Sequence, residues 1–237
     1  VWGYAANISR DNLIEYNHIH DLGHGLLSDM GGIYTLGVQP GTVLRNNHIH
    51  HVEKLNYGAW CIYPDEGSSH MLIEYNLCYR TNGDIFHQHY GRENMVRNNV
   101  FAFGAESITA HGRVNPEHKA FQFERNIFIT DAALIFKGGY GCRLSDRNLR
   151  SDLNLLWAIS RGDALTFVSS GGEKAKVDLT GWRKLGYDRH SVVADPQFAK
   201  PTDDDYTLAK DSPAITELGF EPIDLSTVGP RPAKKRD

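Results

Sequence analysis

The sequence has few cysteines, no excess of basic charge and no long apolar run, and each lack disfavours a class of protein. Three cysteines occur in 237 residues, too few for a disulfide framework, and Cys61 and Cys78 stand in apolar stretches that favour small buried thiols. The formal net charge is −4 and the basic cluster Lys234-Lys235-Arg236 lies at the very end, which disfavours a nucleic-acid partner. No apolar run could span a bilayer, so no membrane contact is expected.

What the sequence does contain is a repeat with a period of 23 to 30 residues. Its copies share six asparagines: Asn17, Asn47, Asn76, Asn99, Asn126 and Asn154. A unit of this length, made of short alternating stretches, is too short for two helices and fits one coil of a β-solenoid. Because asparagine tolerates left-handed backbone and bonds through its amide, we expect one at the same corner of every coil, linked to the next as a ladder.

A second strand with isoleucine at its centre recurs in five units. The five isoleucines are Ile33, Ile62, Ile85, Ile108 and Ile135. Side chains alternate along a strand, so we expect each isoleucine to face the interior and the next residue to face outward. The predicted fold is all-β, a right-handed parallel β-helix of the pectate-lyase-like kind, with the handedness taken from the general rule for parallel crossovers.

The coils are expected to occupy residues 1–198. A segment at about 163–187, which contains Trp182, interrupts the repeat and is expected to form an external insertion. Residues 199–237 form a tail, and the run that starts at Asp195-Pro196 resembles the closing segment of many secreted parallel β-helix proteins. An open solenoid end needs a cover, so this tail is predicted to cap the stack.

The first residues start in mid-pattern, since the chain opens with Val1-Trp2-Gly3 and a repeat unit is recognisable by Asn12. We therefore expect this chain to be the C-terminal part of a longer protein, joined to further N-terminal coils that would carry a signal peptide. The expected location is secreted or periplasmic, and the expected state is a monomer.

Acidic, histidine and aromatic side chains gather beside the isoleucine strand in three consecutive units. Aligned on isoleucine, Asp65, Gln88 and His111 share one outward position, which predicts a carboxylate, an amide and an imidazole in one column. Cleavage of a glycosidic bond needs two carboxyl groups in different environments, and Asp65, Asp29 and Glu66 are the candidates. A competing interpretation makes Asp65 and Glu66 part of a solvated turn.

Asp29 and Asp65 are offset in this alignment. Asp29 lies four residues before its isoleucine and Asp65 three after its own, which corresponds to ~23 Å on straight strands. Gly31 and Gly32 would have to bend the chain to bring Asp29 back to the groove. Asp65 is therefore the central prediction, with Asp29 or Glu66 as its partner.

The remaining predicted site residues would bind the sugar. Aromatic rings can stack on sugar rings, and histidine, amide and guanidinium groups can bond to hydroxyls. These substrate-binding candidates are His89, His111, Gln88, Tyr63, Tyr34, Tyr90, Arg92 and Trp60.

Histidines recur in two groups. Those at His18, His20, His48, His50 and His51 occupy equivalent places in the repeat, which favours a ladder or surface packing. His87, His89 and His111 could bind a metal, since His-x-His is a possible ligand pair, but contacts to substrate hydroxyls are favoured. We expect neither a metal nor a cofactor.

These segments resemble parallel β-helix glycoside hydrolases, and most closely glycoside hydrolase family 141, whose members include α-L-fucosidases and xylanases. The resemblance is carried by Ser28-Asp29-Met30-Gly31-Gly32-Ile33-Tyr34, Ile62-Tyr63-Pro64-Asp65-Glu66-Gly67-Ser68-Ser69 and Gln88-His89-Tyr90-Gly91-Arg92-Glu93-Asn94. It covers about residues 10–130. It implies Asp29 and Asp65 as the catalytic pair and a plant-type or microbial polysaccharide as substrate.

Two alternatives stay open. A polysaccharide lyase would need a lysine or arginine base, often with Ca²⁺, and Arg92, Arg113 and Lys137 are the convenient basic groups. A non-catalytic carbohydrate-binding solenoid would need only the aromatic and polar contacts. The fold by itself does not choose among the three.

Overall fold

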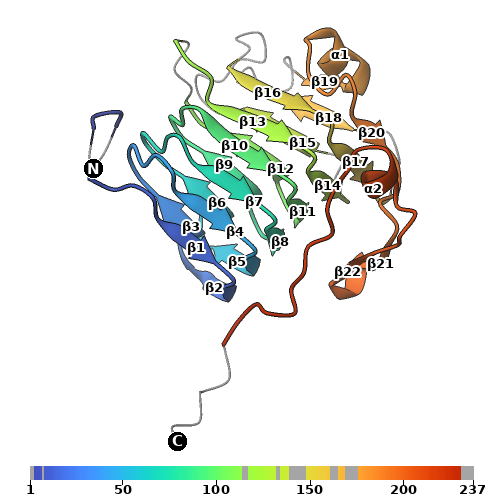
Figure 1. Cartoon of the computed structure of the whole chain (residues 1–237), viewed down its shortest axis with the longest axis horizontal. Coiled ribbons are helices and arrows are strands. Elements are labelled where there is room, and N and C mark those ends of the chain that lie inside the picture. The colour runs from blue at the N-terminus through green and yellow to red at the C-terminus, as the bar shows by residue number, and fades with distance from the viewer. Residues whose placement is uncertain are drawn as a thin grey trace, which may run out of the picture.

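A computed structural model of the chain describes residues 3–6, 8–113, 117–131, 134–138, 148–160, 165–168 and 176–230. It is an all-β parallel solenoid, as predicted, in which each coil adds one strand to each of three sheets (Figure 1). Among the described strands of these sheets, the β18–β19 pair alone is antiparallel. Within the described residues, no helix has the length and apolar character needed to cross a membrane.

Three sheets form the sides of the stack, and they are numbered here in the order in which the chain enters them. The first sheet contains β1 (Leu13–Glu15), β4 (Val43–Arg45), β7 (Leu72–Glu74), β10 (Asn94–Arg97), β13 (Phe121–Glu124) and β16 (Leu149–Asp152). The second contains β2 (His18–Leu27), β5 (His48–Lys54), β8 (Leu77–Thr81), β11 (Val100–Gly104), β14 (Ile127–Thr130), β17 (Leu155–Ala158) and β20 (Val192–Val193). The third contains β3 (Met30–Thr35), β6 (Ala59–Pro64), β9 (Asp84–Gln88), β12 (Ser107–His111), β15 (Leu134–Gly138), β18 (Thr166–Val168) and β19 (Lys176–Asp178).

The asparagine ladder is confirmed at the corner between the first and second sheets. Each Nδ2 donates to the Oδ1 of the next asparagine at 2.9 to 3.1 Å, from Asn17 through to Asn154. The left-handed backbone lies one residue earlier than expected, for example at Tyr75 with φ 55° and at Asn98 with φ 51°. The ladder asparagine therefore supplies the amide bonds, and its predecessor makes the turn.

Replacing Asn99 by alanine should destabilise the solenoid by at least about 2 kcal/mol. Asn99 is fully buried, its Nδ2 donates to Asn126, and its Oδ1 accepts from Asn76, so its loss leaves buried groups unpaired on both sides. Urea unfolding measures the change. Asn17→Ala, at the exposed end of the ladder, is the matched control and should cost clearly less; equal losses would contradict a cooperative buried ladder.

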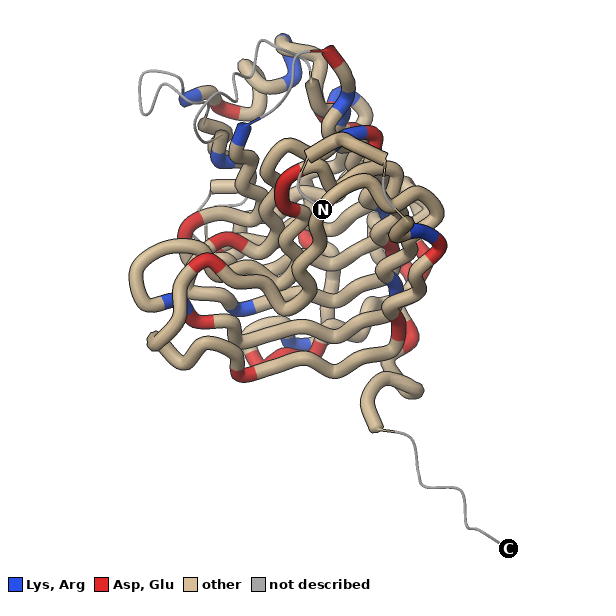
Figure 2. Tube along the Cα trace, turned by 90° about the vertical axis from the view of Figure 1, so that its left-hand side faces the viewer, with Lys and Arg blue, Asp and Glu red and all other residues tan. Residues whose placement is uncertain are grey.

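Charges on the outside of the first sheet alternate in sign over its first five strands, from Glu15 to Glu124, whereas the last pair, Glu124 and Asp152, is acidic on both sides. Arg45 bonds to Glu15 at 2.8 Å and Arg97 bonds to Glu74 at 2.9 Å, because strand register places each pair side by side. Seen from the N-terminal end of the stack, acidic and basic residues are interspersed around its outline (Figure 2). Neighbouring coils between Glu15 and Glu124 therefore attract each other on this face.

The core closes at the C-terminal end with Trp182 of α1 (Leu179–Lys184), which lies beyond the last coils (Figure 1). Trp182 is 1% exposed, its ring stacks on Phe167 at 4.4 Å and lies 5.2 Å from Phe136. The expectation that residues 163–187 pack on the outside is therefore wrong for Trp182. The last core layer would otherwise meet water, and this large ring covers it.

The tail runs back along the outer face of the second sheet (Figure 1). It includes β21 (Phe198–Lys200), a 3₁₀ turn (Pro201–Asp203), β22 (Asp205–Leu208) and α2 (Pro213–Thr216). Its apolar side chains, including Leu218 and Phe220, pack with outward residues of the sheet such as Tyr79 and Val100 in a second apolar cluster. This contact covers a side of the stack, and the predicted capping of an open end stays a prediction.

Two of the three cysteines are described. Cys61 and Cys78 are buried free thiols, as the sequence indicated, and Cys142 lies outside the described residues.

Candidate functional site

The register of the third sheet differs by one residue from the alignment on isoleucine at the step from β6 to β9. All five isoleucines are buried, as predicted, but Ile62 lies opposite Phe86 instead of Ile85. From β9 to β15 the isoleucine alignment holds, since Thr109 lies opposite both Phe86 and Phe136. Phe86 also enters the core, so two successive side chains point inward here. A slip of one residue moves every later side chain to the other face of its strand.

Two predicted site residues are consequently inside the solenoid. His111 is 1% exposed and stacks on Phe136 at 4.6 Å, and burial lowers its pKa to about 3. Gln88, opposite His111, is fully buried and accepts a bond from the backbone amide of Gly91. The prediction that they share an outward column with Asp65 is wrong, because the slip turned them toward the core.

The same slip brings His89 to Asp65. His89 Nδ1 lies 2.9 Å from Asp65 Oδ1, and the hydroxyl of Tyr34 donates to Asp65 Oδ2 at 2.5 Å. Gly112 on the next coil leaves room for the imidazole, because a Cβ there would lie 2.7 Å from His89 Cδ2. Three consecutive coils therefore hold one carboxylate, one phenol and one imidazole together.

Asp65 begins a turn, as the competing interpretation proposed, but its side chain is not solvated. Its carbonyl accepts from the amide of Ser68, which closes the turn, while the residue is only 5% exposed. Burial raises the pKa of Asp65, but hydrogen bonds from His89, Tyr34 and the Glu66 backbone outweigh it and leave the pKa below its usual value. The carboxylate is therefore ionised at neutral pH.

Tyr34→Phe should destabilise the protein more at pH 7 than at about pH 2. A carboxyl whose folded pKa is lowered contributes stability above its unfolded pKa and loses that contribution as pH falls through the folded pKa. Without the Tyr34 hydroxyl the folded pKa of Asp65 rises, and this contribution shrinks. Urea unfolding across pH measures it, with Tyr57→Phe as control, since Tyr57 bonds to Asp29 instead. Parallel pH profiles for the parent and Tyr34→Phe would contradict this account.

An aromatic wall lies beside Asp65 on the outer face of the third sheet. The Trp60 indole stacks on the His87 imidazole at 4.3 Å, and the Tyr63 ring lies 4.3 Å from Trp60 and 5.0 Å from Tyr34. Burial lowers the pKa of His87 to about 3, so this imidazole is neutral. Trp60 and Tyr63 are only 6% and 5% exposed, so Tyr34, which is 43% exposed, offers most of the ring surface on which the apolar face of a sugar could stack.

Asp29 is exposed and lies just before β3, where its backbone amide donates to Tyr57 at 2.9 Å. Burial and the charges of Asp65 and Asp29 raise the pKa of Tyr63. The same two charges also raise the pKa of Tyr34, after the effect of burial. Both hydroxyls thus lie within electrostatic reach of the two acids.

The glycines beside Asp29 have a different role from the one expected. The left-handed residue is Asp29 itself, with φ 58°. Gly31 and Gly32 lie in the strand, where a Cβ would meet Tyr63 Cβ at 2.8 Å or Ile49 Cγ2 at 2.6 Å. These glycines permit close packing of coils, and the turn is made two residues before Gly31, at Asp29.

The other edge of the site contains Glu66, Tyr90 and Arg92. Glu66 is half-buried in the turn after Asp65, and Arg92 lies over the ring of Tyr4 at 5.1 Å. Tyr90 contacts the His89 ring at 4.7 Å, and its hydroxyl accepts from Arg113 at 2.9 Å. Tyr90 therefore lies beside Asp65's imidazole partner, whereas Arg92 is engaged with the N-terminal segment.

A second buried carboxylate, Asp84, was not among the predicted site residues. It is 3% exposed and accepts from the Trp60 indole at 3.2 Å, from the Ser107 hydroxyl at 2.6 Å and from Lys137 at 2.9 Å. Burial lowers the pKa of Lys137, but Asp84 and Glu106 outweigh it and raise the pKa overall. The polar residue directly before Ile85 was the sequence signal for this network.

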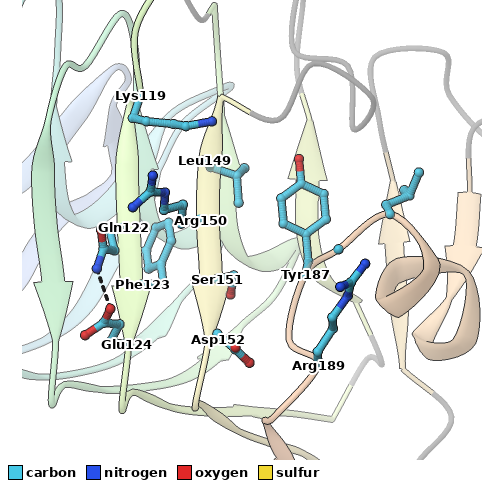
Figure 3. Close-up of a pocket in the computed structure, with 12 residues that line it drawn as sticks. Lys119, Gln122, Phe123, Glu124, Leu149, Arg150, Ser151, Asp152, Tyr187 and Arg189 are labelled. Carbon is cyan, nitrogen blue, oxygen red and sulfur yellow. Dashed lines mark hydrogen bonds between the residues drawn. The ribbon is translucent and has the colours of Figure 1, made fainter.

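A separate hollow of about 410 Å³ lies at β13 and β16 of the first sheet, next to Tyr187 and Arg189. Figure 3 shows Tyr187 and Arg189 on one side of β16, with Arg150 directed to the other side, toward Gln122. Asp152 already accepts from His190 at 2.7 Å. The hollow combines charges of both signs on a different sheet from Asp65, so it provides a comparison site for mutational tests.

No protein-family model, curated protein or solved structure matches this chain. The resemblance to glycoside hydrolase family 141 thus rests on the residues quoted for it, and the chemistry of the site has to carry any functional conclusion.

Proposed function

We propose that this chain is a glycoside hydrolase that cleaves a glycosidic bond in a plant-type or microbial polysaccharide at Asp65. The observation that supports the proposal is a buried carboxylate held between Tyr34 and His89 at the edge of an aromatic wall. Glycosidases place an ionised carboxylate next to the sugar ring, where positive charge develops in the transition state. The aromatic rings of Trp60 and Tyr63 would orient that ring.

Asp65 takes the ionised role in this proposal, because the hydrogen bonds that lower its pKa stabilise the charged form. A second carboxyl group must then protonate the leaving oxygen. Asp29 is the favoured donor, because the resemblance to glycoside hydrolase family 141 pairs it with Asp65, and Glu66 is the substitute. No metal or cofactor is required for this chemistry.

The handedness of the stack, its oligomeric state and its location are part of the same proposal. We propose a right-handed stack of the pectate-lyase-like kind, and the general preference of parallel crossovers supports its handedness. We propose that the protein is a monomer and is secreted or periplasmic, where it would meet its polysaccharide substrate.

The deciding experiment incubates the chain with p-nitrophenyl glycosides and cell-wall polysaccharides and follows two products. A hydrolase releases a new reducing end without a change in absorbance near the unsaturated-uronate band. A lyase forms that chromophore, and a binding module gives retention on the polysaccharide without any product. Lys137 gives little support to the lyase alternative, because its ion pairs keep its ammonium protonated and unfit as a base.

A further inference from the structure

Five histidines gather on the outer face of the second sheet, where β2 and β5 lie side by side at the N-terminal end of the stack (Figure 1). Strand register places His18 opposite His48 and His20 opposite His50. Residues two apart on a strand share a face, so these four imidazoles form a square. The rings of His18 and His48 stack at 4.6 Å, and those of His20 and His50 at 5.2 Å.

Ring nitrogens of three of these histidines lie close to one another. One ring nitrogen each from His18, His48 and His50 lies within 4.8 Å of the other two, and His18 Nε2 is only 2.8 Å from His50 Nε2. The sequence analysis expected a ladder or surface packing here, and the stacked pairs agree with that. Ring stacking alone, however, does not require three ring nitrogens to converge.

The point where these nitrogens meet is open to solvent on one side, and Tyr79 packs against the histidines on the other. His18 is exposed while His48 and His50 are half-buried. The Tyr79 ring stacks on His50 at 4.9 Å, and the Tyr79 hydroxyl lies 3.0 Å from His48 Nε2. A ring held in place by packing and a hydrogen bond is a preorganised ligand.

We propose that His18, His48 and His50 bind one divalent transition-metal ion of the zinc, nickel or copper type. Imidazole nitrogen is a preferred ligand of these ions, whereas Ca²⁺ and Mg²⁺ require oxygen ligands. Three protein ligands leave a further coordination position for water. The site lies on the second sheet, apart from Asp65 on the third, so it does not depend on the proposed hydrolase activity.

Chelator-treated protein titrated with ZnCl₂ in a calorimeter tests this site. We expect one Zn²⁺ per chain, and we expect His18→Gln to weaken binding at least about tenfold. Because His18 is exposed, this variant should fold normally, and a thermal melt without metal checks that. His24→Asn removes an exposed histidine outside the cluster, at a left-handed position that asparagine tolerates, and should bind like the parent.

Two further readouts do not depend on affinity alone. Co²⁺ should give the visible absorption of a nitrogen-ligated ion in the parent, and this band should be lost in His18→Gln/His50→Gln. Zn²⁺ should raise the melting temperature of the parent and of His24→Asn but not of the double variant. Stoichiometric binding that is equally tight in parent and His18→Gln, or no stoichiometric binding at all, would overturn the proposal.

Discussion

Asp65→Asn should lower kcat/KM on a cleaved glycan by at least about a thousandfold. The change keeps the shape of the side chain and removes the negative charge that the proposal places beside the developing positive charge of the sugar. Tyr34 and His89 would remain in place, so substrate binding should change much less than kcat. Initial rates over a range of substrate concentrations separate the two effects, and circular dichroism checks the fold.

Asp152→Asn is the matched control for this prediction. It removes a carboxylate of the same type that also bonds to a histidine, but on the first sheet beside the hollow of Figure 3. Activity should be unchanged in this variant. Full activity in Asp65→Asn together with a loss in Asp152→Asn would move the active site to that hollow.

The partner of Asp65 is identified by the same assay on two further variants. Asp29→Asn should abolish the proton donation that a poor leaving group needs, and it should affect substrates with good leaving groups much less. Glu66→Gln should show this pattern instead if Glu66 is the donor. If neither variant selectively loses activity on substrates with poor leaving groups, Asp65 has no carboxyl partner, and a glycosidase of the proposed type requires one.

Trp182→Ala should destabilise the protein by about 3–5 kcal/mol. Trp182 packs between Phe167, Phe136 and Tyr187 and donates to Asp188 at 2.7 Å, so its removal opens a cavity and leaves a buried carboxylate short of a donor. Urea unfolding followed by far-ultraviolet circular dichroism measures the loss.

Trp182→Phe serves as the matched variant, since it keeps an aromatic ring over the last core layer and loses only the indole bond. It should cost clearly less than alanine. An alanine variant as stable as the parent would mean that Trp182 does not close the core.

The repeat was readable from the sequence because it is encoded locally and many times. Each ladder asparagine stands at the same place in its own unit, and an error in one unit would not change the others. The stacked coils, the buried isoleucines and the ladder from Asn17 to Asn154 therefore followed from spacing and residue type. The left-handed turn residue did not, because residues as different as Tyr75, Arg125 and Leu153 adopt it.

The arrangement of the candidate site residues was predicted in part. Asp65, Tyr34, His89, Tyr63 and Trp60 were singled out from composition beside one strand, and the structure brings them together. Gln88 and His111 were assigned to the wrong face. Asp84 was missed because a single acid before an isoleucine resembles an ordinary strand end.

What the sequence alone determined about this protein is the parallel stack of coils and the strand beside which polar and aromatic residues gather. What only the tertiary structure decided is which of those residues face outward together. Ile85 and Phe86 are adjacent and both apolar, so either could align with Ile62, and the packing of the Phe86 ring against Phe101 and Phe121 made the choice. Since side chains alternate along a strand, that choice placed His89 beside Asp65 and Gln88 in the core.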